Sequence, residues 1–171
     1  MGPLCRTPPC RAPYHAATVR RPARRNPPPY KDVSDVSGGA LVLELTMVAV
    51  SGADAGATAG MTLTEVPSEP GTALRVGRDA AVCRLVTPED WLFVSRVHLE
   101  FRCAPDGTWH LTWLRGSRPD PASEVRLTHG PHVQAVGYGA TVPLPRGGAG
   151  EIVVQERSGP RSVGVGFFHE V

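Results

Sequence analysis

The sequence lacks the long apolar segments that mark membrane and exported proteins. No apolar run approaches the roughly 20 residues that a helix needs to span a bilayer. The N-terminus contains arginines, but the apolar stretch of a signal peptide does not follow them. We therefore expect a cytoplasmic protein with no membrane partner.

Cysteine is scarce as well. Four cysteines do not make a disulfide framework in a chain of 171 residues. Cys5 and Cys10 lie near the N-terminus, whereas Cys83 and Cys103 lie inside apolar patterns, where a free cysteine behaves as a small buried hydrophobe. The sequence has no Cys-x-x-Cys pair and no histidine cluster with zinc spacing. It thus predicts neither a metal site nor a cofactor.

The side-chain sets that most enzymes need are also missing. The glycine-rich segment 147–150 lacks the Lys-Ser/Thr pair and the helix start of a P-loop, and we interpret it as a hairpin loop. Ser95 and His98 lie three residues apart at a strand start. Alternation would point them to opposite faces, which does not suit a nucleophile and its base. We therefore predict that the protein is not an enzyme.

The overall charge favours no particular partner. A formal net charge of +2 is too small to demand a nucleic acid. Lys31 is the only lysine, so nearly all basic residues are arginines. Together with abundant alanine, glycine, proline and valine, this indicates a GC-rich coding sequence, as in actinobacteria.

Residues 1–37 differ in composition from the rest of the chain. Prolines recur through this segment, and the pairs Arg20-Arg21 and Arg24-Arg25 repel one another. Such a segment cannot bury enough apolar surface to offset its ordering entropy, so we expect a disordered Pro/Arg-rich tail. Three interpretations stay open: a basic arm for an acidic partner, a solvated tail, or upstream sequence translated from a misplaced start.

Residues 38–171 show the period-two pattern of strands and are expected to form the folded domain. Strands are predicted at 41–48, 61–66, 72–78, 97–103, 109–113, 125–127, 133–136, 141–144, 151–155 and 163–167. Thr87–Asp90 reads as a helix N-terminus, but the continuous apolar run after it predicts at most one helical turn. Many short strands at roughly 8 to 12-residue spacing predict an all-β sandwich or barrel.

Two short motifs lie within this pattern. Arg75–Asp79 contains a Gly-Arg at a strand end, and Val94–His98 contains a Ser-Arg-x-His that opens a strand. The second motif follows the first by 17 residues, counted from Arg78 to Ser95. With these motifs at this spacing, residues from about 40 to 157 resemble the forkhead-associated (FHA) family, as in a bacterial FHA domain-containing protein. The resemblance implies a β-sandwich of about 11 short strands whose loops at one end bind phosphothreonine peptides.

The resemblance also implies a role for each motif residue. A phosphate group needs a cation and short donors on a rigid frame. Arg78 would supply guanidinium donors, Ser95 a hydroxyl, and Arg96 its backbone N–H or its side chain. Gly77 would serve the turn geometry, and His98 would order the loops without touching the ligand.

A later loop, Gly116–Asp120, departs from the family pattern. The family would read Gly-Ser-Thr-Asn-Gly there, whereas this chain has Ser117 and Arg118 followed by Pro119. We expect Ser117 and Arg118 to contact the phosphopeptide. Pro119 replaces the asparagine that would hold the peptide backbone, and it offers neither a side-chain hydrogen bond nor an N–H.

Three functions are therefore considered. The leading hypothesis is an adaptor in Ser/Thr-kinase signalling, whose partner is a phosphothreonine-containing protein such as a kinase or its substrate. The second is a degenerate FHA-like scaffold that binds an unmodified protein. The third is a nucleic-acid binder that uses the arginine-rich tail, although Tyr14 and Tyr30 are the only aromatic residues there. The sequence predicts no oligomeric state.

Overall fold

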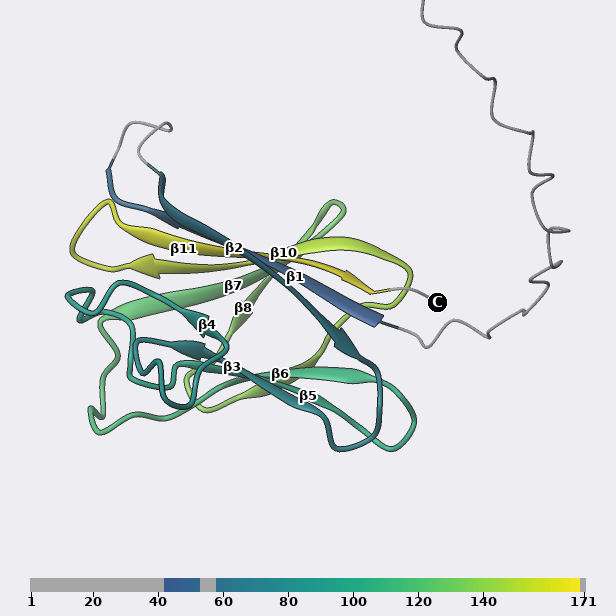
Figure 1. The fold of residues 1–171 in the computed structure, drawn as a ribbon. Coiled ribbons are helices and arrows are strands. Elements are labelled where there is room, and N and C mark those ends of the chain that lie inside the picture. Colours follow the sequence, from purple (N-terminus) through teal and green to yellow (C-terminus); the bar gives the residue numbers. More distant parts are fainter. Residues whose placement is uncertain (1–41, 53–57, 170–171) are drawn as a thin grey trace, which may run out of the picture. The chain divides into compact units, whose positions relative to one another are not determined.

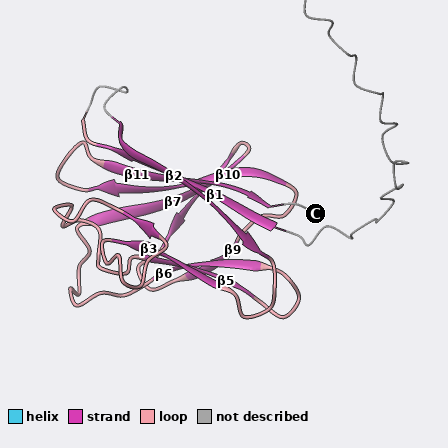
Figure 2. Cartoon of the chain, in the orientation of Figure 1, coloured by secondary structure: helices cyan, strands magenta, loops and turns pink. Residues whose placement is uncertain are grey.

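The computed structural model describes residues 42–52 and 58–169. These residues form strands, turns and loops and contain no helix, as Figure 2 shows. In the described part of the chain there is accordingly no helix that could cross a membrane. The predicted tail, residues 1–37, and the first residues of the predicted domain lie outside the described residues.

The described residues form eleven strands in two stacked sheets (Figure 1). In chain order the strands are β1 (Val42–Val50), β2 (Thr58–Pro67), β3 (Ala73–Gly77), β4 (Leu85–Val86), β5 (Leu99–Cys103), β6 (Trp109–Trp113), β7 (Ser123–His129), β8 (His132–Val136), β9 (Thr141–Pro143), β10 (Gly148–Glu156) and β11 (Ser162–His169). One sheet has the order β2-β1-β11-β10-β7-β8 and the other β4-β3-β5-β6-β9. Only the β3–β4 pair is parallel among these strands. The predicted all-β sandwich is confirmed.

The core lies between the sheets and follows the period-two pattern. Leu43, Leu45 and Met47 of β1 are buried, and Trp109 and Leu111 of β6 belong to the same core. Burial of a large apolar side chain stabilises the fold by about 1.5–3 kcal/mol. The sandwich is therefore a rigid frame from which the loops at its ends project.

One predicted loop is in fact part of a strand. β10 begins at Gly148, so the segment 147–150 is not the hairpin loop that its glycines predict. Gly150 lies opposite Phe167 of β11, and a Cβ at Gly150 would overlap the Phe167 ring. The absence of a side chain at Gly150 therefore leaves space for the Phe167 ring.

The region from Leu85 to Val94 also differs in detail from the prediction. The two-residue strand β4 is too short to show any periodicity in the sequence. Residues 87–94 form no helix, although the N–H of Trp91 donates to the carbonyl of Pro88 at 3.1 Å, as in a single turn. The hydroxyl of Thr87 is buried and has no hydrogen-bond partner among the residues that the structure describes, so it does not cap a helix.

The two cysteines of the described region are free and buried, as predicted. Burial raises the pKa of both the Cys83 and the Cys103 thiol. Within residues 42–52 and 58–169, no cluster of three histidine, cysteine, aspartate or glutamate residues could hold a metal ion.

The core assignment predicts opposite outcomes for two leucines of neighbouring strands. Leu45 of β1 is fully buried, whereas Leu63 of β2 is 63% exposed. We expect Leu45→Ala to lower the free energy of unfolding by about 2–5 kcal/mol because it leaves a cavity. Leu63→Ala should change it by less than about 0.5 kcal/mol. Chemical denaturation of both variants checks this, and equal losses would contradict the assignment.

Candidate functional site

The two sequence motifs lie side by side because the chain after β3 pairs with the chain before β5. The N–H of Arg78 donates to the carbonyl of Ser95 at 3.3 Å. The N–H of Asp79 donates to the carbonyl of Arg96 at 3.0 Å. These hydrogen bonds place the Gly-Arg motif directly against the Ser-Arg motif.

Gly77 permits this close pairing. A Cβ on Gly77 would overlap the carbonyl oxygen of Arg96 and lie 2.8 Å from the carbonyl carbon of that residue. Gly77 does not have a positive φ, so any residue could adopt its backbone conformation. Its role is therefore to leave space for the neighbouring backbone, and not to supply the turn geometry that the sequence predicted.

The side chain of Arg78 is held in place by main-chain carbonyl groups. Its Nε donates to the carbonyl of Val94 at 2.7 Å, and its Nη1 donates to the carbonyl of Glu89 at 2.8 Å. Its Nη2 donates to no residue in the part of the chain that the structure describes. The guanidinium is thus oriented by the protein while part of its donor capacity remains available to a ligand.

The segment that supplies these carbonyls is itself anchored. Trp91 and Phe93 are buried, and their ring centroids are 5.5 Å apart. The Arg161 guanidinium lies 5.9 Å from the centroid of the Trp91 ring and 5.4 Å from that of Phe93. Arg161 also pairs with Glu156 at 2.6 Å, and its hydrogen bonds lower the pKa of that carboxyl group. The residues around Arg78 therefore rest on the end of the other sheet.

His98 connects the serine motif to the core. Its ring is 2% exposed, and its Nδ1 accepts the N–H of Ser95 at 3.0 Å. The ring proton therefore lies on Nε2, which faces the hydroxyl of Ser123 at 3.4 Å. Burial lowers the pKa of His98 to about 4. The imidazole is thus neutral and fixes the backbone of the serine loop.

Ser95 and His98 do not point to opposite faces of a strand, contrary to the prediction from alternation. β5 begins at Leu99, so strand alternation does not extend back to Ser95, and the two residues contact one another. The contact uses the backbone N–H of Ser95 and not its hydroxyl. His98 is therefore not arranged as a base for a serine nucleophile.

The loop between β6 and β7 forms the opposite side of the site. The hydroxyl of Tyr138 accepts the N–H of Gly116 at 2.6 Å and donates to the carbonyl of Arg118 at 2.9 Å. The Tyr138 ring packs edge-on against Trp113, with centroids 5.1 Å apart. Tyr138 therefore braces the loop that carries Ser117 and Arg118.

A pocket of about 300 Å³ lies between these loops. All the residues that the sequence predicts to contact a phosphopeptide line this pocket: Arg78, Ser95, Arg96, Ser117 and Arg118. His98 also lines the pocket, whereas Pro119 is exposed and is not part of the lining. Among the described residues, no aspartate or glutamate lines the pocket, so the charged side chains that they contribute to it are all cationic.

The sequence analysis missed several contributors to the pocket, among them two aromatic residues and a buried serine. Phe93 and Ser123 line it, and Tyr138 both lines it and braces one of its loops. Nothing in the sequence connects Tyr138 to Gly116, which lies 22 residues earlier in the chain. The only local signal was an aromatic residue with a polar tip beside Gly139, a turn glycine with a positive φ.

Comparison with solved structures identifies the architecture. An engineered FHA with a Myc-pTBD peptide aligns with a TM-score of 0.52 and 16% identity, over 76% of this chain and 92% of the other. This chain has an FHA-like fold.

Two further FHA domains are also similar to this chain. The N-terminal FHA domain of S. cerevisiae Rad53p, in complex with a phosphothreonine peptide, has a TM-score of 0.49 and 14% identity, over 73% of this chain and 92% of the other. The MEK1 FHA domain has a TM-score of 0.45 and 14% identity, over 73% and 88%. A scan against models of protein families and a search of curated proteins found no match.

Because Gly77 lies so close to the Arg96 carbonyl, adding a methyl group at this position should lower the stability of the fold. We expect Gly77→Ala to destabilise the FHA-like fold by about 1–3 kcal/mol, because the added Cβ overlaps the Arg96 carbonyl. Gly60→Ala is the control, since nothing lies within 4 Å of a Cβ there and its φ is not positive. The control should change the free energy of unfolding by less than about 0.5 kcal/mol. Equal effects of the two substitutions would refute the role of Gly77.

His98 predicts a pH dependence of stability. Unfolded His98 takes up a proton below its ordinary pKa of 6.5, whereas the native ring does so only near 4. Between these values the unfolded state binds more protons, so stability falls as the pH falls, by about 3 kcal/mol in total. His98→Asn retains an acceptor for the Ser95 N–H but does not titrate. Urea denaturation should show a weaker pH dependence in this variant, and an unchanged dependence would contradict the assignment.

Proposed function

We propose that this chain binds phosphothreonine-containing peptides in the pocket between the β3–β4, β4–β5 and β6–β7 loops. The observation that carries this proposal is the composition of the pocket. Three arginines and three serines line it, and no aspartate or glutamate among the described residues does. A phosphate ester carries about −1.5 to −2 charges and several strong acceptor oxygens, and such a pocket complements both properties.

In this proposal Arg78 is the principal phosphate ligand. Two carbonyls already orient its guanidinium, so little side-chain freedom is lost when Nη2 donates to a phosphate oxygen. The hydroxyl of Ser95 lies in the same pocket and forms no hydrogen bond within the described residues. Arg96 adds a second cation from the adjacent position.

The rigidity of the surrounding loops supports binding of a ligand without large rearrangement. The Arg78 side is fixed by the carbonyls of Val94 and Glu89, and the opposite side by Tyr138. Fixed donors that point into a concave site bind an anion more tightly than mobile ones. The engineered FHA with a Myc-pTBD peptide has the same kind of fold, which is consistent with this use of the loops.

The biological partner proposed on this basis is a protein that carries phosphothreonine, such as a Ser/Thr kinase or a substrate of one. The protein would act as an adaptor without catalytic activity of its own. In keeping with that, His98 is neutral and both of its ring nitrogens face protein atoms. The proposed arm for nucleic acid lies in residues outside the described part of the chain.

A second candidate function is binding of an unmodified protein. Pro119 favours it, because this exposed residue offers no N–H and no polar side chain where an asparagine could hold a peptide backbone. Loss of one or two such hydrogen bonds weakens binding by about 1–3 kcal/mol. Indifference to phosphorylation is the result that would favour this candidate.

The proposal predicts selective binding to phosphorylated peptides. A degenerate peptide library with a central phosphothreonine should bind, whereas the same library with unmodified threonine should not. Arg78→Ala should weaken binding about ten- to a hundredfold, because it removes a charge-assisted ligand. Fluorescence anisotropy of the enriched peptides measures these affinities.

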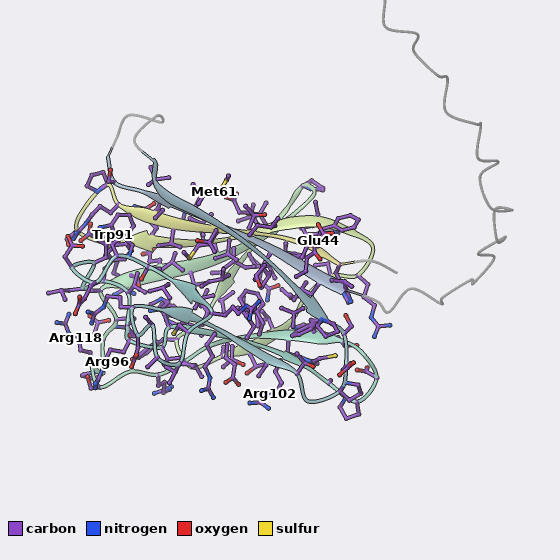
Figure 3. The ribbon with its side chains drawn as sticks, in the orientation of Figure 1. Glu44, Met61, Trp91, Arg96, Arg102 and Arg118 are labelled. Atoms are coloured by element: carbon purple, nitrogen blue, oxygen red, sulfur yellow. The ribbon has the colours of Figure 1, made fainter. Side chains whose placement is uncertain are left out.

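Arg102→Ala provides the matched control. Arg102 is an exposed arginine that pairs with Glu100, and it lies towards the other end of the sandwich from Arg96 and Arg118 (Figure 3). This variant should bind the phosphorylated peptides as the wild type does. Equal binding of the two libraries by the wild type would remove the phosphothreonine proposal and leave the unmodified partner.

A further inference from the structure

The pocket carries more positive charge than a phosphothreonine balances. The charges of the three arginines that line it sum to +3, and no aspartate or glutamate of the described residues lines the pocket to offset them. A phosphate ester supplies at most about two negative charges at neutral pH. A ligand that neutralises the pocket therefore carries at least one further anionic group.

Arg118 has the capacity to bind that second group. Its side chain is exposed, and within residues 42–52 and 58–169 it forms no ion pair and donates no hydrogen bond. Two other arginines near the site are already engaged: Arg157 pairs with Asp120 at 2.9 Å, and Arg161 pairs with Glu156. In Figure 3, Arg118 and Arg96 lie at the same end of the sandwich.

The backbone that carries Arg118 is well defined. The hydroxyl of Tyr138 links the N–H of Gly116 to the carbonyl of Arg118. Pro119 restricts the conformation of the residue before it to the extended region. The side chain of Arg118 is therefore free to interact while its point of attachment at the pocket is fixed.

We propose that Arg118 selects a carboxylate close to the phosphothreonine, so that the preferred ligands are acidic phosphopeptides. This inference rests on the proposed function, and it assigns Arg118 to a neighbouring aspartate or glutamate instead of to the phosphate. The planar guanidinium fork matches a carboxylate bidentately, which explains why an arginine is useful at this position. Proline beside it removes competing backbone contacts and leaves charge as the main source of selectivity.

The test uses peptides with one central phosphothreonine in an alanine background. Aspartate is scanned through the three positions on each side, and every peptide is also made without phosphate. We expect at least one aspartate position to strengthen binding to the wild type about three- to tenfold, as for a partly exposed charge pair. This gain in affinity from aspartate should shrink as the salt concentration rises from about 50 to about 500 mM, because salt screens exposed charge pairs.

Variants of Arg118 identify the residue responsible. Arg118→Lys should keep part of the affinity gain that aspartate provides, and Arg118→Gln should abolish it. Arg118→Glu should bind a phosphopeptide with lysine at the same position more tightly than the one with aspartate. Tyr138→Phe removes the hydroxyl that braces the loop, so it should reduce the gain while binding still depends on phosphate. Arg102→Ala should behave as the wild type.

The two proposals fail in different ways. If phosphorylated peptides bind better than unphosphorylated ones at every position but aspartate adds nothing, the role of Arg118 is overturned and the phosphothreonine pocket stands. An affinity gain from aspartate that persists in Arg118→Gln also overturns the role of Arg118 and leaves the phosphothreonine pocket in place. If phosphate makes no difference in any peptide, both proposals are overturned.

Discussion

The site depends on one close contact between two main-chain segments. Gly77 lies against the carbonyl of Arg96, in space that a Cβ would occupy, and the N–H groups of Arg78 and Asp79 pair with the carbonyls of Ser95 and Arg96. Without this contact, the cation at the end of β3 and the hydroxyl before β5 would project from separate loops. With it, they occupy one pocket, and the carbonyls of Val94 and Glu89 lie within reach of the Arg78 guanidinium.

Both sheets contribute to holding this arrangement. Arg161, just before β11, packs over Trp91 and Phe93 and so supports the loop around Arg78. Ser123, at the start of β7, faces the ring of His98, which in turn fixes the backbone of Ser95. The buried core keeps the two sheets at a constant separation, so loops from both remain in register. The loops are therefore fixed before any ligand is present, which is what a small anionic group requires of its receptor.

Much of this molecule could be predicted from its sequence, because two signals are local. Alternation in segments such as Leu43–Met47 identified the strands and their buried faces, and the spacing of Gly77-Arg78 from Ser95 located the pocket residues. The remaining features depend on tertiary contacts. β4 has only two residues, and Gly150 belongs to a strand in which Phe167 lies opposite it. Tyr138 contacts Gly116 only once β6 and β9 are paired. No local sequence pattern indicates such contacts. The contact between Ser95 and His98 could not be predicted for the same reason, since it does not follow from strand alternation.

The central claim is that the loops at one end of the sandwich form a single binding site for a phosphothreonine peptide. The most direct measurement is a titration of the ¹⁵N-labelled protein with such a peptide, followed by NMR shifts of the backbone amides. The account predicts that the largest shifts occur at 77–79, 94–98 and 115–118, with smaller ones at Tyr138, and that the unphosphorylated peptide produces none. Shifts that instead cluster on the exposed face of β1, β2 and β11, or that are the same for both peptides, would contradict it.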